Sequence, residues 1–269
     1  MLVDTSAGKM YINIVDGKGK NLLFIHGIPT NLMLWREIIP KLDGFRIAVD
    51  LIGYGKSDKP DNKDLSLTAQ SFYLTEVLSS MDVNDIVCIG HDIGGGICQI
   101  LAMRGIVSSM ILVDSAGMDY WPTQTILRLK DPKWDDYIKR VDMLEGFYNS
   151  LRQGVVRKEK ITMEVAKMYA EPFSSKEGKR AYLRAARALD FRDTLKALPE
   201  LNKVKIPTLI IWGDQDVYIP YFHGIRLSNQ IPSSKFILLK DIGHFVSEDD
   251  PLLLASIIKG FVDIYLISN

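Results

Sequence analysis

Short apolar runs alternate with longer helical patterns over roughly the first 115 residues. The runs are 22–25, 45–49, 86–89 and 110–113. They are mostly aliphatic, as expected of strands covered on both faces in a parallel sheet. The stretches between them predict helices over 34–42, 66–81 and 93–104. Strand and helix in alternation predict an α/β fold, with a mostly parallel central sheet flanked by helices.

This rhythm stops between residues 118 and 203, where no strand pattern is visible. The segment is charged and amphipathic, and Tyr182–Asp190 is a strong helix signal. The rhythm then resumes. Strands are expected over 208–212 and 235–239, and helices over 221–230 and from about Pro251. We therefore predict a core domain made of residues 1–117 and 204–269, with residues 118–203 inserted as a helical cap, or lid.

Composition narrows the choice of partner and location. The chain has 33 basic and 33 acidic residues, which gives no support for binding nucleic acid or an anionic membrane. The apolar stretch 251–266 contains two charges and is shorter than the roughly 20 residues of a membrane span. Because the N-terminus does not resemble a secretory signal, we expect a cytoplasmic protein. Cys88 and Cys98 are then expected to be buried, unpaired thiols.

The residues after the third predicted strand are the first candidates for chemistry, because functional groups collect at the carboxyl ends of parallel strands. Gly90-His91-Asp92-Ile93-Gly94 has the pattern of a nucleophile elbow, in which a strand turns sharply into a helix. Asp92 occupies the nucleophile position. The alternative interpretation is that Asp92 only caps the helix that follows.

Chain order favours a catalytic interpretation. Nucleophile, acid and histidine follow one another in the α/β-hydrolase template, and Asp92, Asp216 and His244 each follow a predicted strand in that order. The other histidines are expected elsewhere. We expect His26 to brace the first loop and His91 to point away from the site. His223 is expected on the surface of a helix.

Five segments in order carry a resemblance to the α/β-hydrolase superfamily that covers nearly the whole chain. They are His26–Pro29, Asp50–Asp58, Gly90–Gly95, Trp212–Asp216 and Gly243-His244. An aspartate at the elbow is similar to epoxide hydrolases and to haloalkane or haloacetate dehalogenases. The helical insertion matches the position of their cap.

The resemblance implies a role for each matching residue. Asp92 would be the nucleophile, His244 the general base and Asp216 the acid that orients His244. Asp114 and Asp214 are alternative candidates for that acid. The oxyanion hole would use the main-chain N–H groups of Ile28 and Ile93. No metal or other cofactor is expected, since the histidines and cysteines lack metal-site spacing.

An ionised aspartate suits attack on a saturated carbon, which gives an alkyl–enzyme ester that water then hydrolyses. We expect a small, largely apolar substrate, with water as second substrate. Ile28 and Ile93 stand where dehalogenases carry side-chain donors for the halide, and this favours an epoxide hydrolase-like activity. The candidates for substrate binding are Tyr120, Trp121, Trp134, Tyr148 and Tyr182.

Other activities stay open. The protein could be a haloalkane or haloacid dehalogenase, a carboxylesterase-type hydrolase, or a non-catalytic receptor for a small molecule, because one fold supports many functions. The sequence does not define an oligomeric state.

Overall fold

An eight-stranded sheet forms the centre of the protein in the computed structural model, which describes residues 1–265. The strand order is β1-β2-β4-β3-β5-β6-β7-β8, and pairing is parallel from β4 to β8. Their bounds are β1 Leu2–Thr5, β2 Gly8–Val15, β3 Asn21–Ile25, β4 Phe45–Val49, β5 Ile86–His91, β6 Ser109–Val113, β7 Thr208–Gly213 and β8 Ser234–Leu239. The predicted α/β fold with a mostly parallel sheet is confirmed.

Strands β1 and β2 were not predicted. They add an antiparallel edge to the parallel sheet, with β2 paired to β4. Met10 and Ile12 on β2 are fully buried, whereas their neighbours are partly exposed. This alternation is the pattern of a strand with one covered face, and it differs from the continuous apolar runs of the central strands.

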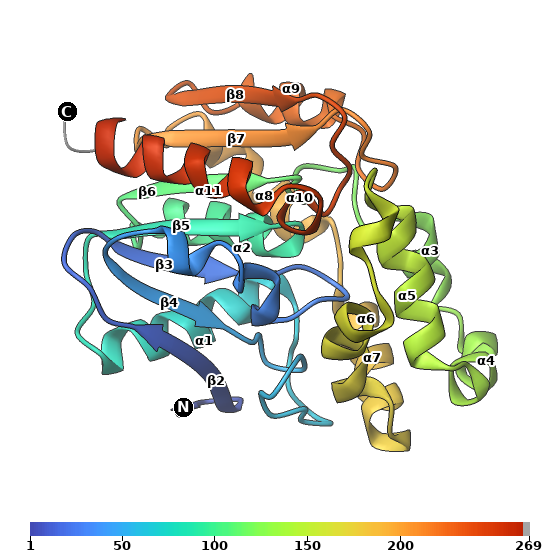
Figure 1. Ribbon diagram of the computed structural model, residues 1–269. Coiled ribbons are helices and arrows are strands. Elements are labelled where there is room, and N and C mark those ends of the chain that lie inside the picture. The colour runs from blue at the N-terminus through green and yellow to red at the C-terminus, as the bar shows by residue number, and fades with distance from the viewer. Residues whose placement is uncertain (266–269) are drawn as a thin grey trace.

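Helices cover both faces of the sheet (Figure 1). Those of the core are α1 Leu67–Ser80, α2 Ile93–Met103, α9 Phe222–Ser228, α10 Val246–Asp249 and α11 Pro251–Gly260. The prediction of a helix over 34–42 is wrong. Two 3-10 turns, Leu32–Trp35 and Ile39–Lys41, replace it, because Pro40 has no N–H and disfavours helical geometry at the residue before it.

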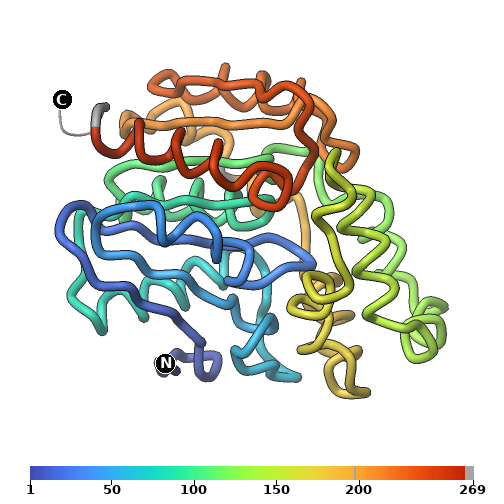
Figure 2. The backbone as a smooth tube through the Cα atoms, in the orientation of Figure 1, coloured from blue at the N-terminus to red at the C-terminus, as the bar shows by residue number. Residues whose placement is uncertain are grey.

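The segment between β6 and β7 contains six helices and no strand. They are α3 Gln124–Arg128, α4 Asp135–Arg140, α5 Met143–Gln153, α6 Met163–Ala170, α7 Lys176–Ala188 and α8 Arg192–Leu201. Helices α3 to α7 lie beyond the carboxyl ends of the parallel strands, while α8 packs against α2 of the core (Figure 1). The tube in Figure 2 follows the chain out of the sheet after β6 and back into β7. The helical insertion therefore lies over the sheet edge where functional groups collect.

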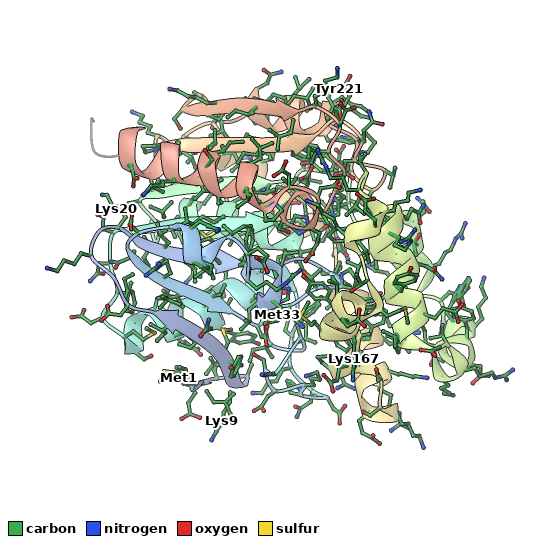
Figure 3. The ribbon with its side chains drawn as sticks, in the orientation of Figure 1. Met1, Lys9, Lys20, Met33, Lys167 and Tyr221 are labelled. Carbon is green, nitrogen blue, oxygen red and sulfur yellow. A yellow bond between two sulfur atoms is a disulfide. The ribbon has the colours of Figure 1, made fainter. Side chains whose placement is uncertain are left out.

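The core fills the space between the sheet and its helices. Strands β5, β6 and β7 are buried along their whole length, and so is the body of α2. Surface residues such as Lys20 and Tyr221 lie at the periphery (Figure 3). Across residues 1–265, none of the helices combines the length and the apolar character needed to cross a bilayer.

The expectation that Cys88 and Cys98 are unpaired is wrong, because the two residues form a disulfide. Cys88 lies on β5, Cys98 lies on α2, and both are fully buried. Helix α2 folds directly back onto the strand that it follows, which brings the two Cα atoms to 5.8 Å, within the range of a disulfide. Spacing along the chain does not reveal this proximity.

Two adjacent acidic residues at the end of α10 attach the helical insertion to the core. Glu248 forms a bidentate ion pair with Arg36, at 2.6 and 2.8 Å, and accepts a hydrogen bond from Tyr169 of α6. The Asp249 carboxylate accepts hydrogen bonds from the main-chain N–H groups of Val156, Arg157 and Gly243. Since both acids are buried, these contacts fix the insertion above the sheet.

Glu248→Ala should destabilise the protein by about 3–5 kcal/mol, because it leaves the Arg36 guanidinium and the Tyr169 hydroxyl without their buried partner. Urea denaturation measures the change. Glu200→Ala is the matched control, because the Glu200–Lys203 ion pair is exposed and should contribute little. Equal midpoints for the two variants would show that the buried cluster does not hold the insertion in place.

Candidate active site

The bend between β5 and α2 projects Asp92 above the sheet. Its backbone has φ 52° and ψ −120°, a conformation that non-glycine residues rarely adopt. Glycines at positions 90 and 94 permit the bend, since a Cβ at Gly90 would meet the backbone of Gly94, and one at Gly94 would meet that of Ile25. Such strain costs about 1–3 kcal/mol and is typically stored at functional sites.

The two oxygens of the Asp92 carboxylate have different surroundings. Oδ1 accepts hydrogen bonds from the main-chain N–H of Ile28 at 3.2 Å and of Ile93 at 2.6 Å. Oδ2 faces Nε2 of His244 at 3.7 Å. Gly27 allows the first loop to approach this closely, because a Cβ there would lie 2.5 Å from the Cβ of Asp92. The carboxylate is therefore fixed, with one oxygen directed towards the histidine.

His244 connects Asp92 to Asp216. Its Nδ1 lies 2.8 Å from Oδ2 of Asp216, and Oδ1 of Asp216 accepts from the N–H groups of Tyr218 and Ile219, each at 2.8 Å. All three members of the predicted set are buried, and the structure brings them together. This geometry places an imidazole between two carboxylates.

The other histidines lie where the sequence predicted. His26 braces the first loop, accepting at Nε2 from the N–H of Leu51 and contacting the carbonyl of Gly27 through Nδ1. His91 points away from the cavity, and its Nε2 bonds the carbonyl oxygen of His244. His223 lies on α9 and stacks on Tyr120.

Burial and charge shift the titration of the site in opposite directions. Desolvation raises the pKa of Asp92 above its usual value, although His244 and the N–H groups of Ile93 and Ile28 oppose the shift. Burial by itself lowers the pKa of His244, but the Asp216 carboxylate, followed by Asp92, outweighs it and raises that pKa above the ordinary histidine value.

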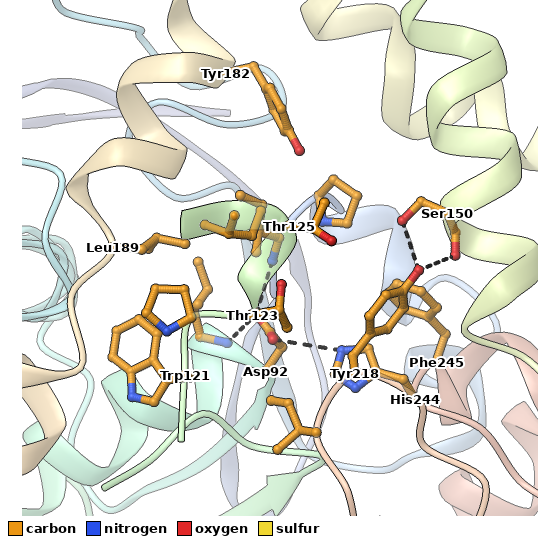
Figure 4. Close-up of a pocket in the computed structure, with 16 residues that line it drawn as sticks. Asp92, Trp121, Thr123, Thr125, Ser150, Tyr182, Leu189, Tyr218, His244 and Phe245 are labelled. Atoms are coloured by element: carbon orange, nitrogen blue, oxygen red, sulfur yellow. Dashed lines mark hydrogen bonds and ion pairs between the residues drawn. The ribbon is translucent and has the colours of Figure 1, made fainter. Parts of the chain in front are cut away.

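A cavity of about 90 Å³ lies over Asp92 and His244. Its walls come from the first loop, the elbow, the His244 loop and the helical insertion (Figure 4). Apolar groups dominate, with a few hydroxyls. The lining includes Ile28, Ile93, Trp121, Tyr182, Tyr218 and Phe245. No lysine or arginine lines this cavity within residues 1–265.

Two of the five predicted substrate-binding side chains line the cavity, Trp121 and Tyr182. Trp121 directs its indole N–H to the Thr194 hydroxyl at 2.6 Å. The other three are placed elsewhere. The hydroxyl of Tyr120 donates to the carbonyl of Ser115, Tyr148 packs against the guanidinium of Arg152, and Trp134 lines a neighbouring cavity of about 330 Å³.

Tyr218 and Phe245 line the cavity but were missed by sequence reasoning. Both rings pack edge-on against the His244 imidazole, with centroids at 5.3 and 4.9 Å. The Tyr218 hydroxyl donates to the carbonyl of Ser150 on α5. Each lies within two residues of a predicted catalytic position, and that proximity was the available signal.

The alternative acids occupy different places. Asp114 follows β6 and is fully buried near Asp216 and His244. Asp214 accepts from the N–H of Ile242 and braces the turn that precedes His244. Of the three acids, Asp216 is the one hydrogen-bonded to the histidine.

The family model for the α/β hydrolase fold matches residues 20–251, so the chain belongs to the α/β-hydrolase family.

Its relatives include an uncharacterized hydrolase and a haloalkane dehalogenase. The uncharacterized hydrolase YugF of Bacillus subtilis is 29% identical over 248 residues, covering 90% of each chain. A haloalkane dehalogenase of Mesorhizobium japonicum is 24% identical and covers 93% of this chain and 87% of its own. Among solved structures, an α/β hydrolase fold protein from Burkholderia ambifaria superposes with a TM-score of 0.87 at 23% identity, covering 96% of both chains.

Proposed function

We propose that this α/β hydrolase opens epoxides on small, largely apolar molecules through a covalent alkyl–Asp92 ester. The observation that carries the proposal is that the two oxygens of the Asp92 carboxylate have different contacts. Oδ1 is held by two N–H donors, while Oδ2 lies beside His244 under a largely apolar cavity. An N-cap aspartate would need neither the cavity nor the histidine.

In the first step, Oδ2 of Asp92 attacks a saturated ring carbon and the ring C–O bond breaks. The carboxylate needs no base for this attack because it is the reactive form. The N–H groups of Ile28 and Ile93 hold Oδ1, and this contact orients Oδ2 towards the cavity. Oδ1 then becomes the carbonyl oxygen of the ester.

In the second step, His244 takes a proton from water, and the resulting hydroxide attacks the ester carbonyl of Asp92. Negative charge then develops on Oδ1, which is the atom that the two N–H donors already contact. Asp216 stabilises the imidazolium through Nδ1. Collapse of the tetrahedral intermediate releases the alcohol and regenerates Asp92.

The leaving group distinguishes the possible activities. Halide departure needs N–H donors at the cavity wall, but Ile28 and Ile93 offer no side-chain donor and the Trp121 N–H is bonded to Thr194. A haloacid carboxylate would meet no lysine or arginine among the described lining residues. Attack on an ordinary ester would give an energetic anhydride. Ring opening is therefore favoured over these alternatives.

Tyr182 is our candidate for the acid that protonates the opening oxygen. It enters the cavity from α7 with its hydroxyl directed towards Asp92 (Figure 4). Burial raises its pKa to about 12, so it is a neutral donor near pH 7. Within residues 1–265, no other group is hydrogen-bonded to that hydroxyl. Its proton would pass to the ring oxygen, and after the second step the imidazolium of His244 would return one to the phenolate through water, which resets both groups.

The neighbouring cavity suggests the shape of the substrate. It shares Pro29, Thr125, Ser150 and Tyr182 with the cavity over Asp92 and is lined mainly by apolar groups of the insertion. A small reactive ring could then occupy the inner cavity, while an apolar substituent extends past Tyr182 into the outer one. A panel of epoxides, haloalkanes, haloacids and aryl esters, with graded alkyl length, tests both the reaction class and this shape.

His244→Gln should form the alkyl–Asp92 ester but fail to hydrolyse it, because only the second step needs the base. Intact-protein mass spectrometry with a reactive epoxide should show a stable adduct, and peptide mapping should locate it at Asp92. His223→Gln is the control, since His223 lies outside the cavity, and should turn over normally. Turnover of an aryl ester that survives in Asp92→Ala would contradict the assignment of Asp92 as the nucleophile.

Ester hydrolysis should slow as the pH falls through the pKa of His244, because protonated His244 cannot act as a base. In the free enzyme the charges of Asp216 and Asp92 raise the pKa of His244 above its ordinary value. Esterification neutralises Asp92 and removes one cause of that elevation. Single-turnover rates of ester hydrolysis, measured across pH, should therefore give an apparent pKa below the pKa of His244 that NMR measures in the free enzyme.

Tyr182→Phe should reduce epoxide opening by about 10²–10⁴-fold, the usual contribution of a positioned acid, while leaving the fold intact. Tyr148→Phe is the control, because Tyr148 does not line the cavity. Equal epoxide rates in both would rule out Tyr182 as the acid.

A further inference from the structure

Two buried carboxyl groups, not one, lie behind His244. Asp114 follows β6 and Asp216 follows β7, and these strands are neighbours in the parallel sheet. One oxygen of each carboxyl and one ring nitrogen of His244 all lie within 4.8 Å of one another. Asp114 has φ 42°, so its backbone also adopts the left-handed conformation. The site therefore presents an acid at both strand ends that could serve His244.

The hydrogen-bond donors are divided unequally between the two acids. Asp216 accepts three, from the N–H groups of Tyr218 and Ile219 and from His244. Asp114 accepts one at Oδ1, from the N–H of Gly213 at 2.9 Å. Its Oδ2 is buried, and no N–H or O–H group within residues 1–265 donates to it. The donors thus stabilise a charge on Asp216 and leave an oxygen of Asp114 uncompensated.

A proton on Asp114 would remove the uncompensated charge at its Oδ2. Two carboxylates so close together and excluded from water cannot both be ionised, and the proton goes to the one with fewer donors. We propose that Asp114 is a neutral carboxylic acid that donates a hydrogen bond from Oδ2 to Asp216, and that it acts as a positioning residue for the Asp216–His244 pair. Its effect on catalysis rests on the function proposed above, but its protonation does not.

The electrostatics of the site support this assignment. Burial, followed by the Asp216 charge, raises the pKa of Asp114 well above its usual value. Besides Asp216, the charged group that acts on Asp114 is the more distant Asp92, and it shifts the pKa in the same direction. The pair carries a single negative charge, which matches the one imidazolium that His244 becomes during ester hydrolysis.

Asp114 should also be able to replace Asp216 as the partner of His244 when Asp216 is neutralised. In Asp216→Asn the neighbouring charge disappears, so the second of the two main causes that raise the pKa of Asp114 is lost. Asp114 can then ionise next to His244 and supply the negative charge that the imidazolium needs. In a site with one acid, the corresponding change lowers the rate by about 10⁴-fold.

The test compares Asp114→Asn, Asp114→Ala, Asp216→Asn and the double Asn variant. Infrared difference spectra at neutral pH should show a protonated carboxyl band in the wild type that is lost in Asp114→Asn. Asparagine can replace the neutral acid, accepting from Gly213 and donating to Asp216. The His244 titration followed by NMR should therefore be preserved in Asp114→Asn and altered in Asp114→Ala. Neither measurement needs a substrate, so both remain informative if the alkyl–ester mechanism fails.

Single-turnover hydrolysis of the alkyl–Asp92 ester supplies the second readout. Asp114→Asn should stay within about threefold of wild type, Asp216→Asn should retain part of the rate, and the double variant should lose about 10⁴-fold. Absence of the infrared band, a His244 titration that Asn disturbs as much as Ala, or equal rates for Asp216→Asn and the double variant would each overturn the proposal. So would a stoichiometric metal ion bound by these groups, found by native mass spectrometry.

Discussion

The two main-chain N–H groups that hold Oδ1 of Asp92 are the constraint on which the rest of the site depends. They come from distant parts of the chain, the loop after β3 and the first turn of α2, so the sheet must bring both strand ends to one point. Meeting there requires glycine at positions 27, 90 and 94, where any side chain would collide with the site. A fixed carboxylate costs backbone strain, and the surrounding packing of buried strands and helix α2 tolerates it because it has no room to relax.

The insertion between β6 and β7 converts this exposed carboxylate into an enclosed one. Helices α3, α5 and α7 and their connecting loops supply most of the cavity roof. The buried Glu248 and Asp249, four and five residues after His244, anchor α6 and the segment after α5 in the same insertion. The same short segment therefore carries the imidazole and fixes the roof above it. Burial also raises the pKa of Asp92 above its usual value.

The central strands and the order Asp92, Asp216, His244 could be predicted from sequence because continuous apolar runs and the residues that end them are local signals. Features that depend on contacts between distant segments could not. The strand at 8–15 shows only a weak alternation, and Pro40 broke a helix that the apolar pattern favoured. Tyr120, Trp134 and Tyr148 do not line the cavity over Asp92, and the sequence of the insertion carries no signal for which of its aromatic side chains do. The division into a core of residues 1–117 and 204–269 and a cap of residues 118–203 stays a prediction, as does the cytoplasmic location.

The Cys88–Cys98 disulfide encloses the strained bend in a covalent ring. Cys88 precedes Asp92 by four residues, Cys98 follows it by six, and the bridge joins the strand to the helix on either side. Closing a loop of this size removes about 3 kcal/mol of conformational freedom from the unfolded chain, comparable to the cost of the distorted backbone that it surrounds. The bridge therefore adds a covalent limit, beside the packing, on how far the strand and the helix can separate around residue 92.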